Sequence, residues 1–88
     1  MTREEALKII REEDLRHYNI CEQRPYREME FVIQNYDGKW VVYVTDERAS
    51  VITGSEAVFI SESDAWDNFI KRLRISKRIE QRTNGKYH

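Results

Sequence analysis

The chain has few residues suited to nucleophilic or metal chemistry. Its 88 residues include one cysteine, Cys21, and two histidines, His17 and His88. A Cys–His nucleophile needs a third group to orient it, and a structural zinc site usually takes four such ligands. We therefore expect Cys21 to pack as a small apolar residue. We expect no metal and no cofactor.

The run Asp46-Glu47-Arg48 is the other candidate for chemistry. It follows a strand-forming stretch, and neighbouring strand residues point to opposite faces, so only Asp46 and Arg48 would share one. Opposite charges at the end of a strand usually lie in a solvent-exposed loop that leaves the sheet. The first alternative is that they contact a partner, and the second is that they act as an acid–base pair. The sequence also lacks a glycine-rich phosphate loop and a nucleophile elbow. We predict that the protein is not an enzyme.

The bulk composition fits one small, highly charged domain. Charged residues make up 35% of the chain and hydrophobic residues 40%, which is enough for a single core in a chain of this size. We expect one domain over residues 1–82 and a disordered tail over residues 83–88. No apolar run approaches the roughly 20 residues needed to span a bilayer. The acidic, amphipathic start does not resemble a signal peptide, so we expect a cytoplasmic protein.

Charge is distributed unevenly along the chain. Residues 1–69 hold 15 acidic and 8 basic residues, whereas residues 70–88 hold 7 basic residues and one acidic residue. The basic segment could bind phosphates as a small nucleic-acid-binding module. The pI near 6.1 is low for that class of protein, and a basic helix facing water or the protein's own acids is the simpler interpretation.

The periodicity of apolar residues predicts an α+β fold. Two helices should flank four strands, and an antiparallel meander with both helices packed on one face is the simplest two-layer arrangement. Thr2 and Glu5 form a capping box for the first helix, and Ser61 or Ser63 should cap the second. The expected elements are a helix over 3–17, strands over 18–24, 28–36, 39–45 and 56–60, and a helix from about 62 to 82.

The central hairpin is specified by its turn and its alternation. Asp37-Gly38 is a typical two-residue hairpin turn, and it would pair Ile33 with Val42 and Phe31 with Val44. Face one, the expected core face, then holds Met29, Phe31, Ile33, Trp40, Val42 and Val44. A slip of one residue would expose all of these side chains.

Face two, the opposite face of the hairpin, is the expected partner-binding surface. An exposed apolar patch with a polar border is typical of protein interfaces, and tyrosine is enriched in them. Alternatively, the N-terminal strand, the tail or a second copy of the chain could cover this face. The expected contact residues are Glu28, Glu30, Val32, Tyr36, Val41, Tyr43, Asp46, Glu47 and Arg48.

Three motifs in order resemble one known family. They are Thr2-x-x-Glu5-Ala6, the run from Tyr43 to Ser50, and Ser61-Glu62-Ser63-x-Ala65-x-x-x-Phe69-Ile70-x-x-Leu73. Together they resemble the immunity protein 59 family of bacterial polymorphic toxin systems, over roughly residues 1–78. The resemblance implies a non-catalytic protein that binds and blocks a cognate toxin domain, and many such toxins are nucleases. A homodimer is a further possibility.

Overall fold

The computed structural model describes residues 1–86 and confirms the α+β class, with one helix at each end of the chain. The elements are α1 (Arg3–Glu12), β1 (Tyr18–Ile20), β2 (Phe31–Tyr36), β3 (Lys39–Val44), β4 (Ala57–Phe59) and α2 (Glu62–Lys86). Among the described residues, no helix is both long and apolar enough to cross a membrane.

Both helices begin at the predicted caps, but their ends differ from the expectation. The Thr2 hydroxyl accepts a hydrogen bond from the Glu5 amide at 3.2 Å, and the Ser61 hydroxyl accepts one from the Asp64 amide at 3.4 Å. α1 is shorter than expected because the chain turns into the left-handed conformation at Asp14, with φ of 52°. α2 continues to Lys86. The expected tail over 83–88 therefore overlaps this helix, and its last two residues lie outside the described residues.

The hairpin register is confirmed. Ile33 pairs with Val42 and Phe31 pairs with Val44 in the antiparallel β2–β3 ladder. Asp37 and Gly38 both have positive φ, at 50° and 81°, as a twisted two-residue hairpin turn requires. β4 then pairs antiparallel with β3.

The first strand differs from the expected meander, because β1 pairs parallel with β2. The sheet order is β1-β2-β3-β4, so the sheet is mixed and mostly antiparallel. Parallel neighbours cannot be joined by a tight turn and need a longer crossover. Residues 21–30 make that crossover, which we call the crossover segment, and β1 ends at Ile20 instead of running on toward Pro25.

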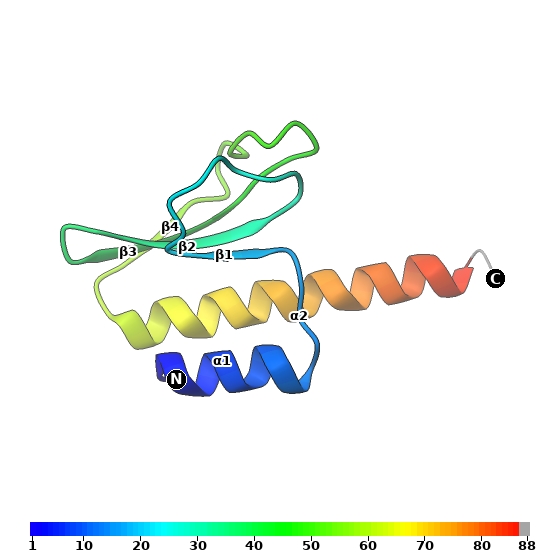
Figure 1. Ribbon diagram of the computed structural model, residues 1–88, viewed down its shortest axis with the longest axis horizontal. Coiled ribbons are helices and arrows are strands. Elements are labelled where there is room, and N and C mark those ends of the chain that lie inside the picture. The colour runs from blue at the N-terminus through cyan, green and yellow to red at the C-terminus, as the bar shows by residue number, and fades with distance from the viewer. Residues whose placement is uncertain (87–88) are drawn as a thin grey trace.

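The core lies between face one of the sheet and α2, and it continues between α2 and α1. α2 lies directly under β2, β3 and β4, and α1 packs against α2 on the side away from the sheet (Figure 1). Trp66 stands edge-on to Phe69, with ring centroids 5.8 Å apart. The buried residues of this cluster are Ala6, Ile10, Leu15, Ile33, Val42, Ala65, Trp66, Phe69, Ile70 and Leu73.

The crossover segment folds over face two and is held there by a buried carboxylate. Glu30 is only 2% exposed. Its carboxylate accepts hydrogen bonds from the Arg24 guanidinium at 2.6 Å and from the Arg27 amide at 3.0 Å. Thr45 lies at the adjoining edge of β3, where its hydroxyl accepts from the Glu30 amide at 2.8 Å. The first two bonds close the segment on itself, and the bond to Thr45 ties its end to the residue that follows β3.

Burial and hydrogen bonding shift the pKa of the Glu30 carboxyl in opposite directions. Burial by itself would raise its pKa, but the hydrogen bonds from Arg24 and from the Arg27 amide lower it below the ordinary value of 4.5. A carboxyl with a lower pKa in the folded state stabilises that state above its unfolded pKa. The stabilisation is lost as the pH falls through the folded pKa.

Replacing Trp66 by alanine tests the core. The side chain is fully buried, so we expect the Trp66→Ala variant to lose about 3–5 kcal/mol of unfolding free energy, measured by urea denaturation. Ile60 is 89% exposed, so the control Ile60→Ala should remain within about 0.5 kcal/mol of the wild type. Equal effects of the two substitutions would contradict the described packing.

Replacing Arg24 by methionine tests the buried ion pair. The variant leaves a buried carboxylate without its cation, which should lower the free energy of unfolding at pH 7. The difference in unfolding free energy between the variant and the wild type should become smaller below pH 4.5. In that range Glu30 becomes protonated, and the wild type loses the stabilisation that the ion pair provides. Denaturation at a series of pH values measures both effects. A double variant, Arg24→Met with Glu30→Leu, should recover most of the loss, whereas no recovery would show that the pair is not the cause.

Candidate partner-binding surface

The structure buries three of the residues expected to contact a partner. Glu30, Val32 and Tyr43 are 4% exposed or less, because the crossover segment covers this part of face two. The expectation that they face solvent is therefore wrong. Glu30 holds the segment in place, and Val32 and Tyr43 pack beneath it.

The remaining part of face two is open and forms a shallow hollow of about 330 Å³. Tyr36, from β2, is 54% exposed, and Val58, from β4, is 60% exposed. We call this feature the tyrosine hollow. Its lining residues come from β2, β3, the region around β4 and the crossover segment: Tyr26, Tyr36, Val41, Tyr43, Val51, Glu56 and Val58.

The tyrosine hollow is lined both by residues that were predicted to contact a partner and by residues that were not. Tyr36, Val41 and Tyr43 were expected here, whereas Tyr26, Glu56 and Val58 were not. Glu56, which directly precedes β4, and Val58 alternate with Ala57, so both lie on the outer face. The pairing of Val58 with Val41 could have been inferred only if the register of β4 had been known. No sequence signal places Tyr26 above the sheet.

Two of the tyrosines support each other directly. The Tyr26 and Tyr43 hydroxyls lie 2.6 Å apart, and their rings meet edge to face at 82° with centroids 5.8 Å apart. Burial, with hydrogen bonds to Tyr26 and Tyr36, raises the pKa of the Tyr43 hydroxyl well above its usual range. The phenol of Tyr43 is therefore neutral at physiological pH and can both donate and accept a hydrogen bond.

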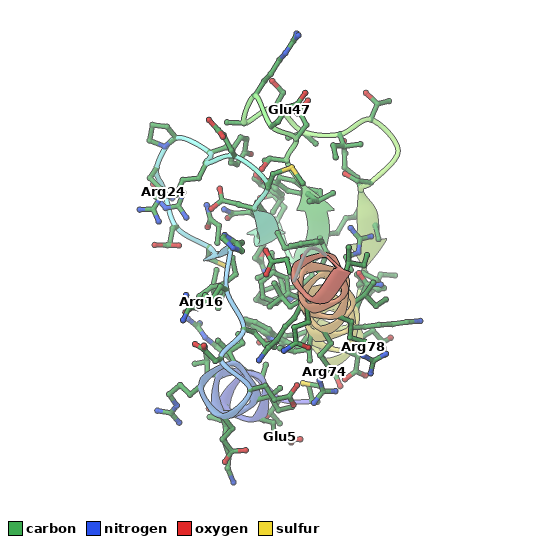
Figure 2. The ribbon with its side chains drawn as sticks, turned by 90° about the vertical axis from the view of Figure 1, so that its right-hand side faces the viewer. Glu5, Arg16, Arg24, Glu47, Arg74 and Arg78 are labelled. Carbon is green, nitrogen blue, oxygen red and sulfur yellow. The ribbon has the colours of Figure 1, made fainter. Side chains whose placement is uncertain are left out.

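The charged run after β3 forms a loop at the end of the sheet. The Asp46 carboxylate accepts hydrogen bonds from the Arg48 amide at 2.8 Å and the Ser50 amide at 3.0 Å. This side chain therefore organises the loop, as aspartate often does in turns. Glu47 and Arg48 are exposed at the tip, and Glu47 lies far from the helices (Figure 2).

Glu28 lies near the same loop. The Met29 amide donates to the Asp46 carbonyl at 3.0 Å, which ties the crossover segment to the loop. Glu28 is exposed beside this contact. The exposed residues Glu28, Glu47 and Arg48 thus border the outer face, a few residues along the chain from Tyr26 and Tyr43.

Basic side chains of α2 are engaged within the protein. The Arg74 guanidinium makes two hydrogen bonds to the Glu13 carboxylate, at 2.9 and 2.5 Å, and this contact lowers the pKa of the Glu13 carboxyl. The Lys77 ammonium donates to the Glu13 carbonyl, and Arg72 donates to the Ser55 carbonyl at 2.8 Å. Lys71 and Arg78 are exposed.

A second hollow lies on the helix side of the sheet. It has a volume of about 610 Å³, and its walls are mainly aliphatic. The residues around it include Met29, Phe31, Val44, Ile75 and Ile79. We call this feature the α2 groove. At one end His17 lies 3.5 Å from Glu80.

The described residues contain no group of three or more histidine, cysteine or acidic side chains placed to hold a metal ion. Cys21 is half-buried and free. The described surface has three features: an aromatic hollow on the outer face, a charged border with Glu28, Glu47 and Arg48, and a largely apolar groove along α2.

Comparison of the sequence with known proteins and protein families identifies the family of this chain. Neither the curated proteins nor the solved structures contain a significant match. The family model of immunity protein 59 matches residues 2–86, which is nearly the whole chain and includes all six helices and strands. The chain belongs to the immunity protein 59 family.

Proposed function

We propose that this protein is a cytoplasmic immunity protein that binds a cognate toxin domain and blocks it without catalysis. Membership of an immunity protein family suggests neutralisation of a toxin. The observation that carries the binding surface is the tyrosine hollow, an exposed aromatic and aliphatic depression on the face of the sheet away from both helices.

The composition of the hollow favours it over the α2 groove as the contact surface. Interface cores are enriched in aromatic residues, and tyrosine combines a large apolar area with a hydroxyl that can pair with a partner. The hollow has three tyrosines among its lining residues. The groove is lined by one partly buried phenylalanine, four aliphatic residues and four polar or charged residues.

The charge inside the hollow supports a basic partner. Glu56 is the one charged residue among the described residues that line the hollow, whereas the exposed border carries both the acidic Glu28 and Glu47 and the basic Arg48. A carboxylate at the contact speeds encounter with a positively charged partner. It would suit a nuclease toxin, whose substrate-binding cleft is basic.

The alternative, a nucleic-acid-binding module using α2, is weakened by the contacts of that helix. Arg72, Arg74 and Lys77 each hydrogen-bond to another part of the protein. Phosphate binding through these side chains would require those bonds to break. Among the α2 side chains that the structure describes, Lys71 and Arg78 remain exposed, and two bases are too few for the strong, salt-dependent affinity of a dedicated module.

Capture of the toxin tests the proposed function. The probe is a toxin domain identified among the genes next to this one in the native host, inactivated by mutation and immobilised. We expect the wild type to bind it, and the Val58→Asp variant to lose about 30-fold or more in affinity, as for a buried interface residue. Calorimetry of the free proteins checks that folding is unchanged, because Val58 is 60% exposed.

The matched control places the same charge in the α2 groove. Ile75 is 44% exposed on α2, so the Ile75→Asp variant should bind the toxin as the wild type does. If Ile75→Asp abolishes capture and Val58→Asp does not, the groove is the contact surface. If the wild type fails to bind, the proposed function itself is wrong.

A further inference from the structure

The walls of the tyrosine hollow define the kind of group that it can receive. Tyr36, Tyr26 and Tyr43 come from β2, the crossover segment and β3. The rings of Tyr26 and Tyr43 meet at 82°, so they form a corner instead of a flat stack. At about 330 Å³, the hollow lies at the lower end of the range for ligand sites, which suits one side chain of a partner.

Charge selects among the possible side chains. Glu56 is the one charged residue among the described residues that line the hollow. The faces of aromatic rings carry a negative potential that attracts cations, and the carboxylate acts in the same direction. An anionic group would be repelled by both, and an aliphatic group would leave the carboxylate without a partner.

The hydroxyls reinforce this selection. Tyr43 has a raised pKa, so it adds no negative charge of its own, and its hydroxyl pairs with that of Tyr26. Tyr36 is 54% exposed, so its hydroxyl oxygen can accept a hydrogen bond from an N–H group. The hollow thus combines ring faces, phenol oxygens and one carboxylate, which are the groups that pair with an ammonium or guanidinium.

We infer that the tyrosine hollow receives a lysine or arginine side chain of the toxin, which docks against Tyr36 and pairs with Glu56. The inference rests on the proposed function and specifies the chemistry of the same surface. An inhibitor that captures a basic side chain of a toxin would compete with an acidic substrate for that side chain.

A titration without the toxin tests the hollow directly. The probes are N-acetyl-arginine amide and its neutral analogue N-acetyl-citrulline amide, added to the isotopically labelled protein and followed by NMR. We expect the arginine compound to shift resonances of Tyr36, Tyr26 and Val58 in a saturable way, and the citrulline compound to shift them far less. Equal shifts, or none at these residues, would overturn the inference.

Variants at Tyr36 and Glu56 test the same contact in the toxin complex. Tyr36→Phe keeps the ring face and should stay within about threefold of the wild-type Kd, whereas Tyr36→Leu should weaken binding by about 5- to 30-fold. Glu56→Gln should weaken binding at low salt, and the difference should shrink as salt is added. Glu12→Gln, an exposed acid on α1, is the matched control.

The two experiments separate failure of the inference from failure of the proposed function. A wild type that binds the toxin, together with Tyr36→Leu and Tyr36→Phe variants of equal affinity, would overturn the cation contact and leave the function standing. If the wild-type protein binds no toxin, the proposed function is wrong, and the proposed partner of the hollow is wrong with it.

Discussion

The ion pair between Glu30 and Arg24 determines which part of the outer face reaches solvent. A buried carboxylate is stable only when its charge is compensated by a cation and by hydrogen bonds. Arg24 and the Arg27 amide supply both from the crossover segment, so burial of Glu30 requires the segment to lie over β2 and β3. The same placement covers Val32 and brings Tyr26 against Tyr43. The tyrosine hollow is the part of face two that this cover leaves open.

The parts of the fold that local chemistry determines could be predicted from the sequence. Asp37-Gly38 fixes the turn and alternation fixes the faces, so the β2–β3 register follows from neighbouring residues. The parallel pairing of β1 could not be predicted in this way, because it depends on the crossover segment returning across the sheet. The absence of a tight-turn sequence between residues 21 and 30 was the available signal against a meander.

The candidate site was predicted only in part, because it also depends on contacts between residues that are distant in the sequence. An isolated glutamate in an alternating pattern is normally exposed, and nothing near Glu30 in sequence reveals that Arg24 will enclose it. Tyr36 and Val41 were correctly placed on the outer face. Glu56 and Val58 were missed because short edge strands carry little register information. The basic end of the chain was correctly suspected of pairing with the protein's own acids, as Glu13 and Arg74 show.

The central claim is that the outer face binds the toxin and the helix side does not. Amide hydrogen exchange of the protein, measured with and without the inactivated toxin domain, tests it most directly. We predict slower exchange in β4 and in the exposed end of the β2–β3 hairpin on complex formation, with unchanged rates in α1 and along α2. Protection confined to α1 and α2, with none at β4 or the hairpin, would contradict the account.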